Sequence, residues 1–189
     1  MICLVDLTCR AHSLSHDEFV APVARIVDGA GHGSKEMHFS EITTDDLEGA
    51  TGIILCGTAL KDNQFATRRR EFFWLRNVSV PVLGICAGMQ ILCLVFGGTI
   101  RPGCEIGMTE IRTVSPDPIL PWDQAFQGFE LHSFICDPPP GWLVTSVSDG
   151  GAQSIRHPER PFYGVMFHPE VRNKEIVERF LALCQRKVP

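Results

Sequence analysis

Several features that mark common functional classes are missing from these 189 residues. No run of Lys and Arg is long enough to indicate nucleic-acid binding, and 17 basic against 22 acidic residues give a net charge of −5. The one basic cluster, Arg68 to Arg70, falls in a segment with helical periodicity, where charges usually face solvent. The longest apolar stretch, around 91–96, is far too short for a membrane span. We therefore expect neither nucleic acid nor a membrane as a partner.

The eight cysteines lack the spacing of common metal and redox sites. None forms a Cys-x-x-Cys pair, so zinc-ribbon and thioredoxin-like sites are not indicated. The N-terminus has no signal-peptide pattern, and several cysteines lie in apolar runs, where Cys behaves as a small buried hydrophobic residue. Reduced thiols and a cytoplasmic location are expected. The N-terminal histidines fit no metal-ligand spacing either, so no metal and no cofactor is expected; they are His12, His16, His32 and His38.

The first half of the chain alternates short apolar runs with helical patterns. Predicted strands cover 2–7, 36–39, 51–55 and 80–85, and predicted helices cover 17–27, 64–75 and 87–95. Because strands that alternate with helices pair in parallel through crossover connections, this order predicts an α/β fold with a doubly wound, mainly parallel sheet flanked by helices. The length fits one domain spanning residues 1–189.

The second half is richer in strands, which Pro- and Gly-rich turns separate. Predicted strands cover 105–114, 127–134, 142–148, 151–156 and 162–167. This spacing predicts antiparallel additions to the sheet. An amphipathic pattern predicts a final helix at 173–185.

The most informative segment runs from Val82 to Gln90 and reads Val-Leu-Gly-Ile-Cys-Ala-Gly-Met-Gln. A buried strand passes through Gly-x-Cys-x-Gly into a helix, which is the nucleophile-elbow arrangement with Cys86 as the nucleophile. Gly84 and Gly88 allow strand and helix to pass closely at this sharp turn. The turn presents Cys86 at the carboxyl edge of the sheet, beside a helix N-terminus whose partial positive charge favours a thiolate. The alternative is that the glycines serve tight packing around an inert thiol.

A second motif lies near the C-terminus, where an apolar strand ends at His168 and Glu170 follows after Pro169. A thiol nucleophile needs an imidazole to take up and return its proton, and the imidazole needs an acceptor on its other nitrogen. Pro169 restricts the link between ring and carboxylate. Alone, the pattern would fit a capped turn. Together with Cys86 at the end of another strand, it predicts a triad of Cys86, His168 and Glu170.

The segments VLGICAGMQILCLVFGG and YGVMFHPEVRNKEIVERFL together resemble the class I glutamine amidotransferases, most of all the glutaminase portion of GMP synthetases. The resemblance covers nearly the whole chain and includes Glu-Ile-Gly at 105–107. It implies a flavodoxin-like fold and an enzyme that hydrolyses the γ-amide of glutamine. In that reaction Cys86 forms a thioester, His168 protonates the departing ammonia, and Glu170 orients His168.

The resemblance also implies residues around the substrate. Gln90, one helical turn beyond Cys86, matches the family position that contacts glutamine. Ser133 and Phe134 match the segment that binds its amino-acid end, and Gly57 matches a glycine of the loop beside the nucleophile. The alternatives are an ordinary helix-surface residue for Gln90 and a polar strand end for Ser133 and its neighbour His132.

Two departures from the family pattern matter. The oxyanion hole should combine the backbone N–H of Ala87 with a second N–H from the loop after the third strand, where two adjacent glycines are usual. Thr58 replaces the second glycine, and a β-branched residue disfavours the positive φ that a flipped peptide would need. The segment LHSFICD at 131–137 also differs from the corresponding segment of GMP-synthetase glutaminases. The resemblance therefore supports the triad more strongly than it supports GMP as the end product.

Three functions remain open. The leading hypothesis is a subunit that supplies ammonia from glutamine to a separate synthetase, because the chain has no phosphate-binding Gly-rich loop of the P-loop type and no room for a synthetase domain. The second is a stand-alone hydrolase of γ-glutamyl amides with the same triad. The third is a non-catalytic regulatory module that retains the fold.

Overall fold

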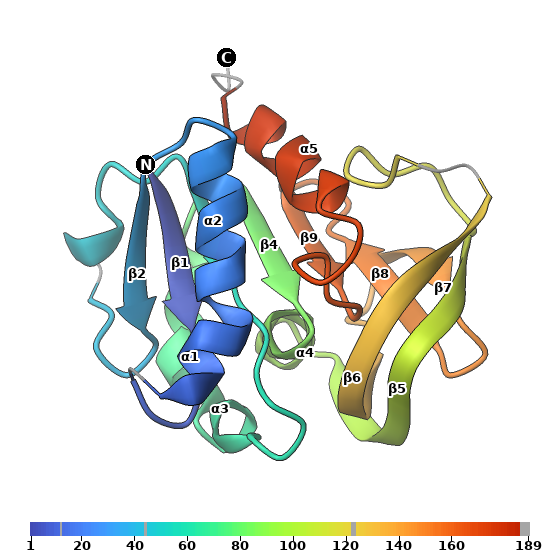
Figure 1. The fold of residues 1–189 in the computed structure, drawn as a ribbon. Helices are drawn as coiled ribbons and strands as arrows, with labels where there is room; N and C mark the ends of the chain where they lie inside the picture. Colours follow the sequence, from blue (N-terminus) through green and yellow to red (C-terminus); the bar gives the residue numbers. More distant parts are fainter. Residues whose placement is uncertain (12, 44, 122–123, 186–189) are drawn as a thin grey trace.

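The computed structural model describes residues 1–11, 13–43, 45–121 and 124–185, so His12 lies outside the described residues. Within them, nine strands form one sheet in the order β2-β1-β3-β4-β9-β8-β7-β5-β6 (Figure 1). The strands are β1 (Ile2–Asp6), β2 (Ser34–His38), β3 (Gly52–Leu55), β4 (Val82–Ile85), β5 (Thr99–Thr113), β6 (Ala125–Asp137), β7 (Leu143–Val147), β8 (Ala152–Arg156) and β9 (Phe162–Val165). The α-helices are α1 (Leu14–Phe19), α2 (Ala21–Gly29), α3 (Gln64–Thr67), α4 (Ala87–Val95) and α5 (Glu175–Cys184), and 3-10 helices cover Asp45–Leu47 and Arg69–Arg76.

One half of the sheet is parallel and covered by helices on both faces. Strands β2, β1, β3, β4 and β9 run in the same direction. Alternate side chains of β1 pack to opposite faces, with Ile2 and Leu4 in the cluster that α2 and α5 complete, and Cys3 and Val5 in the cluster that α3 and α4 complete. Figure 1 shows these two helical layers in front of and behind the sheet. The predicted α/β fold with a mainly parallel sheet is confirmed.

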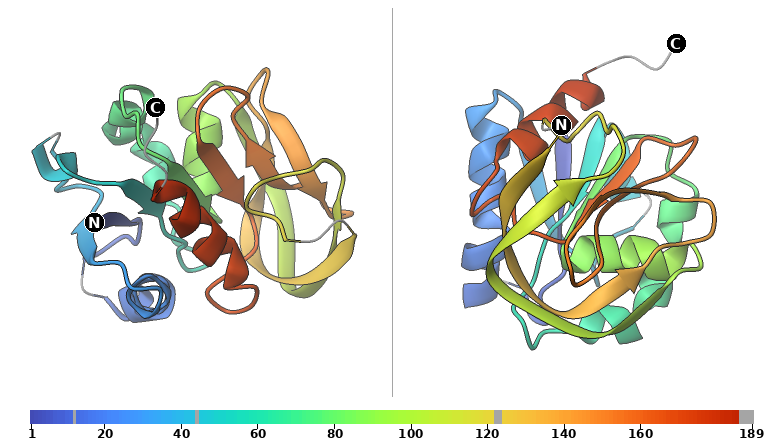
Figure 2. Two further views of the ribbon diagram at one scale, coloured as in Figure 1. Left: turned by 90° about the horizontal axis from the view of Figure 1, so that it is seen from above. Right: turned by 90° about the vertical axis from the view of Figure 1, so that its right-hand side faces the viewer.

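The other half of the sheet is antiparallel and dominated by one long hairpin. Strands β5 and β6, of 15 and 13 residues, pair along most of their length, with a register shift between Pro102 and Glu105. They form a long curved ribbon (Figure 2). The backbone of β6 returns to the parallel half, where Phe129 O accepts a hydrogen bond of 2.8 Å from His168 N. This contact joins the two halves beside the predicted active site.

Three predicted elements differ from the structure. The strand predicted at 162–167 was expected to be antiparallel; β9 is antiparallel to β8 but parallel to β4, because the sheet changes direction between β8 and β9. The single helix predicted at 64–75 is instead the short α3 followed by a 3-10 helix, with the break at Arg68. The helix predicted at 17–27 begins earlier and is divided at Val20, just before the helix that carries Pro22 in its first turn.

All eight cysteines lie within the described residues and are free thiols. None of the helices in the described part of the chain is long and apolar enough to cross a membrane. The cytoplasmic location stays a prediction.

Candidate active site

Cys86 occupies the turn between β4 and α4 in a strained backbone conformation. Its φ is 48° and its ψ is −102°, and apart from glycines only one other described residue, Asn173, has a positive φ. Such conformations persist only where the surroundings enforce them. Here they do: a Cβ on Gly84 would lie 2.5 Å from the Gly88 carbonyl carbon, and a Cβ on Gly88 would overlap the Leu55 carbonyl oxygen. Both glycines of Gly-x-Cys-x-Gly are thus required by close backbone approach.

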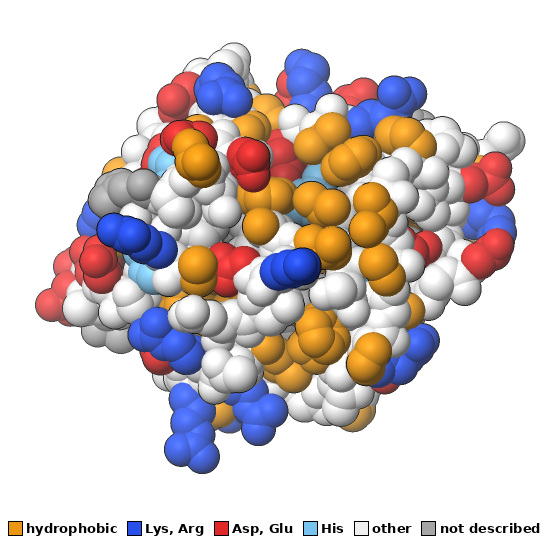
Figure 3. Space-filling view, turned by 60° about the horizontal axis from the view of Figure 1, so that its bottom comes forward, with side chains coloured by type: hydrophobic (Ala, Val, Ile, Leu, Met, Phe, Trp, Pro, Cys, Tyr) orange, Lys and Arg blue, Asp and Glu red, His pale blue; other side chains and the backbone are white. Residues whose placement is uncertain are grey.

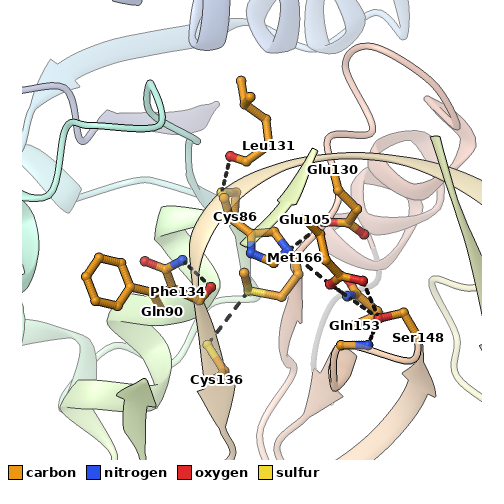
Figure 4. A network of polar contacts seen from close by, with 12 residues as sticks. Cys86, Gln90, Glu105, Glu130, Leu131, Phe134, Cys136, Ser148, Gln153 and Met166 are labelled. Carbon is orange, nitrogen blue, oxygen red and sulfur yellow. Dashed lines mark hydrogen bonds and ion pairs between the residues drawn. The ribbon is translucent and has the colours of Figure 1, made fainter. Parts of the chain in front are cut away.

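The side chain of Cys86 is almost fully enclosed, with 3 % of its surface exposed. Its Sγ lies 3.8 Å from the carbonyl oxygen of Leu131 on β6, within the range of a weak S–H···O hydrogen bond (Figure 4). Leu131 was not predicted as a site residue, because a backbone carbonyl leaves no signal in the sequence. The long β5–β6 hairpin therefore forms one wall around the thiol.

His168 and Glu170 form a buried pair just beyond the end of β9, the strand adjacent to β4. His168 Nδ1 lies 2.6 Å from Glu170 Oε1, and both side chains are at most 1 % exposed. Burial favours the neutral ring, but the charges of Glu170 and then Cys86 outweigh it, so the pKa of His168 is raised well above its usual value. Nε2 of His168 has no hydrogen-bond partner among the described residues, and so remains available for the thiol.

Gly57 and Phe19 pack against the imidazole of His168. A Cβ on Gly57 would lie 2.8 Å from His168 Cε1, so a larger residue would displace the ring. The predicted substrate-binding residue Gly57 therefore contacts the ring itself. Phe19, from α1, lies with its ring centroid 5.5 Å from that of His168. Sequence reasoning missed Phe19, whose apolar periodicity indicated only core packing.

Thr58, the predicted oxyanion-hole residue, is buried and lies in the loop that follows β3. It is not among the described residues with positive φ, so it retains a conformation that suits a β-branched side chain. Its Oγ1 donates a hydrogen bond of 3.0 Å to the carbonyl oxygen of Asp62 within the same loop. Ala87, the other predicted member, is the first residue of α4. Both line one small cavity beside Cys86.

Of the predicted substrate residues, Gln90 and Ser133 line the same cavity, and Phe134 contacts Gln90. Gln90 Nε2 donates a hydrogen bond of 3.3 Å to the carbonyl oxygen of Phe134, and Ser133 Oγ donates one of 3.2 Å to the carbonyl oxygen of Leu60 (Figure 4 shows the Gln90 contact). The cavity measures about 10 Å³, which is room for about one water molecule. The structure thus brings the predicted residues together around Cys86, in a conformation that is closed to a substrate of the size of glutamine.

From the sequence, His132 could be interpreted as part of a polar strand end. In the structure it is deeply buried. It lies opposite Glu105 in the β5–β6 register and close to Glu130, and both its ring nitrogens lack a hydrogen-bond partner among the described residues. Polar residues at alternate positions of a strand usually face solvent, which is why sequence reasoning missed this cluster.

Comparisons with known proteins identify the family of this chain. The family model for glutamine amidotransferase class I matches residues 17–187. A glutamine-hydrolyzing GMP synthase subunit of Methanothrix thermoacetophila is 36% identical over 160 residues, covering 79% of this chain and 85% of that protein. The corresponding GMP synthase subunit of Methanopyrus kandleri is 28% identical over 186 residues, covering 90% and 95%.

A solved structure shows the same fold. A glutamine amidotransferase of Thermotoga maritima superposes with a TM-score of 0.72 at 20% sequence identity, covering 96% of this chain and 80% of that one. The family model spans most of the chain, and its match takes in Cys86, His168 and Glu170. The chain therefore belongs to the class I glutamine amidotransferase family, as its sequence motifs predicted.

Proposed function

We propose that this protein hydrolyses the γ-amide of glutamine with Cys86 as nucleophile, His168 as acid and base, and Glu170 as the residue that orients His168. The observation that carries the proposal is the arrangement on adjacent strands: a strained cysteine at the end of β4 beside a buried imidazole–carboxylate pair beyond the end of β9. Thiol catalysis requires an oriented base beside the nucleophile, and strained backbone is often found at active sites.

The reaction follows from these positions. His168 Nε2 takes the thiol proton, Cys86 Sγ bonds to the amide carbon, and negative charge develops on the amide oxygen. His168 then returns the proton to the nitrogen, the C–N bond breaks, and ammonia leaves a thioester on Cys86. Water adds to the thioester carbon while His168 accepts its proton, and glutamate departs as the thiol recovers that proton. Glu170 holds the Nδ1–H and stabilises the charged ring.

Substrate entry requires the loop from 57 to 64 to move away from β6. The cavity beside Cys86 has room for about one water, and the Ser133–Leu60 hydrogen bond ties the loop to the hairpin. Opening would release Ser133 from Leu60 and so make it available for the amino-acid end of glutamine. It would also free the Thr58 peptide to turn its N–H towards the oxyanion, next to that of Ala87.

We further propose that the ammonia passes to a separate synthetase subunit, and that the synthetase makes GMP. The names of the similar proteins, which are subunits of GMP synthases, support a second subunit. An exposed apolar surface on β5 could bind this second subunit. Ile106 and Met108 are 61 % and 51 % exposed. They pair in register with Leu131 and Phe129, which flank the active site. Figure 3 shows hydrophobic side chains gathered on the face onto which the carboxyl ends of the parallel strands open. Exposed apolar patches of this kind commonly mark protein interfaces.

The test is covalent labelling and turnover of the purified chain. A glutamine-analogue electrophile should modify Cys86, as peptide mass spectrometry would show, and Cys86→Ala should abolish ammonia release from glutamine. Cys93→Ala is the matched control, because Cys93 lies on the same helix α4 and is fully buried. If Cys86→Ala retained activity and Cys93→Ala lost it, the proposed nucleophile would be wrong. Hydrolysis of γ-glutamyl amines with no response to a synthetase would instead support a stand-alone hydrolase.

A further inference from the structure

Three ionisable side chains meet on the inner face of the β5–β6 hairpin. Alternation along β6 places Glu130 and His132 on one face of the strand and Leu131 on the other. Glu105 on β5 stands directly opposite His132 in the register. The side chains of Glu130 and His132 are 0 % and 1 % exposed, and that of Glu105 is 15 % exposed. None of the three belongs to the proposed triad.

Two carboxylates face the same imidazole nitrogen. Nε2 of His132 lies 3.1 Å from Glu130 Oε2 and 3.4 Å from Glu105 Oε2. Yet neither nitrogen of His132 and neither oxygen of Glu130 has a hydrogen-bond partner among the described residues. One ligand atom from each side chain lies within 4.8 Å of those of the other two. The three atoms thus converge on a common point.

The rest of the surroundings hold Glu105 in place. Ser148 Oγ donates a hydrogen bond of 2.8 Å to Glu105 Oε1, and Gln153 Nε2 donates one of 2.7 Å to Glu105 Oε2 (Figure 4). Gln153 Nε2 also lies 2.9 Å from Ser148 Oγ. Outer groups that orient a carboxylate in this way are typical of metal ligands, whose direction must be fixed before the ion arrives.

Charge balance points in the same direction. A carboxylate buried without a compensating positive charge is strongly destabilising. A divalent cation would supply that positive charge to Glu130 and Glu105. Carboxylate oxygen and imidazole nitrogen suit first-row divalent ions, and Zn²⁺ binds both at about 2.0–2.2 Å. Ligand atoms 3.1 and 3.4 Å apart are compatible with one ion at such distances.

We propose that Glu105, Glu130 and His132 bind one divalent transition-metal ion, with Zn²⁺ as the probe that tests it. The ion would fasten β5 to β6 at the two residues that flank Leu131, whose carbonyl oxygen lies against the Cys86 thiol. Its role is structural and lies outside the glutaminase reaction. The proposal is independent of the proposed function, because binding is measured on a protein without its catalytic thiol.

The experiment measures Zn²⁺ binding by equilibrium dialysis with elemental analysis, on protein freed of metal by a chelator. The parent carries Cys86→Ala and Cys104→Ser, which remove a thiol near His168 and an exposed thiol next to Glu105. We expect the parent to bind one more Zn²⁺ per chain than Glu105→Gln or Glu130→Gln. Glu110→Gln is the matched control, since Glu110 is an exposed carboxylate on the same strand and should bind as the parent does.

A second readout is thermal melting, because an ion that binds only the folded chain raises its melting temperature. Zn²⁺ should raise the melting temperature of the parent and of Glu110→Gln, but not that of Glu105→Gln. If Glu130→Gln fails to fold, Glu105→Gln decides the matter, since Glu105 is partly exposed. Equal Zn²⁺ stoichiometry and equal melting shifts in the parent and Glu105→Gln would overturn the site and leave a metal-free ion cluster in its place.

Discussion

The two halves of the sheet bury different kinds of side chain. In the parallel half, β1, β3 and β4 are buried on both faces, and apart from Asp6 at the end of β1 their residues are apolar or glycine. In the antiparallel half, buried positions carry ionisable, amide and hydroxyl groups; they include Glu130, His132, Thr145, Ser146, Gln153 and Ser154. The interior of the parallel half is thus almost wholly apolar, whereas that of the antiparallel half also contains polar side chains. The proposed triad lies where the two halves meet.

The largest effect is expected at that junction. His168→Ala should lower the rate of glutamine hydrolysis by about 10⁴-fold or more, because His168 is the proposed carrier of the thiol proton. Glu170→Gln should be about ten- to a hundredfold milder, since the carboxylate orients the ring and supports its charge. Steady-state ammonia release measures both. His157→Ala is the control, as His157 lies in the turn before β9 and away from the thiol; an equal loss there would argue for a structural cause.

The same pair predicts a pH effect. Because Glu170 helps to raise the pKa of His168 above its unfolded value, the protonated ring stabilises the fold at low pH, and this stabilisation is lost as the pH rises through the folded-state pKa. Glu170→Gln should lower the pKa of His168 and flatten this dependence. NMR titration of the ring, together with denaturant unfolding at several pH values, tests it. An unchanged pKa in Glu170→Gln would remove Glu170 as the partner.

In the parallel half of the sheet, a substitution at the turn between β4 and α4 should lower stability. Gly88→Ala should lower the free energy of unfolding by about 2–3 kcal/mol, because its Cβ would overlap the Leu55 backbone, which cannot rotate away. Gly29→Ala is the matched control: no atom lies within 4 Å of its Cβ position, so that variant should be neutral or slightly stabilised. Urea denaturation compares the two. Equal stability would contradict the tight contact between β3 and α4.

The loop after β3 predicts a smaller change, in the opposite direction. Thr58→Gly should raise the turnover of the isolated chain by about tenfold, since glycine adopts positive φ freely and part of the lost oxyanion stabilisation would return. Thr58→Ser, which keeps the hydroxyl that donates to Asp62 O, should change turnover little. Adding the synthetase should stimulate the wild type more than Thr58→Gly. Fast turnover of the isolated wild type, unaffected by Thr58→Gly, would show that Thr58 already supports an assembled hole.

The smallest effect tests the polar half. Ser154→Ala removes the hydroxyl that lies 2.6 Å from Thr145 Oγ1 and 2.7 Å from Ser146 Oγ, leaving both without this partner. The expected loss is about 1 kcal/mol of unfolding free energy. Ser79→Ala, at an exposed position, should be neutral in the same urea denaturation measurement. Equal stability of the two variants would mean that the buried hydroxyls add nothing to the antiparallel half.

The sequence predicted the parallel half better than the antiparallel half, for a physical reason. Buried strands, amphipathic helices and the Gly-x-Cys-x-Gly turn are local patterns, and α4 coincides with its predicted range of 87–95. The pairing direction of β9 depends on β4, which is distant in the chain. The spacing of turns could not indicate this contact, and it led to the prediction of an antiparallel strand. The burial of Glu130 and His132 likewise depends on what the hairpin packs against, and the Leu131 carbonyl carries no sequence signal at all. Several predicted site residues line one cavity beside Cys86, but nothing in the sequence indicated that this cavity would be too small for glutamine.

That closed cavity also governs how the protein meets oxidants. Peroxides and electrophiles attack thiols that they can reach, and Cys86 is 3 % exposed, whereas Cys9 and Cys104 are exposed. The resting chain therefore exposes two thiols outside the proposed triad and encloses the proposed nucleophile. Glutamine, by opening the loop, would make Cys86 vulnerable only while substrate is present to occupy it, so that turnover and susceptibility to inactivation rise together.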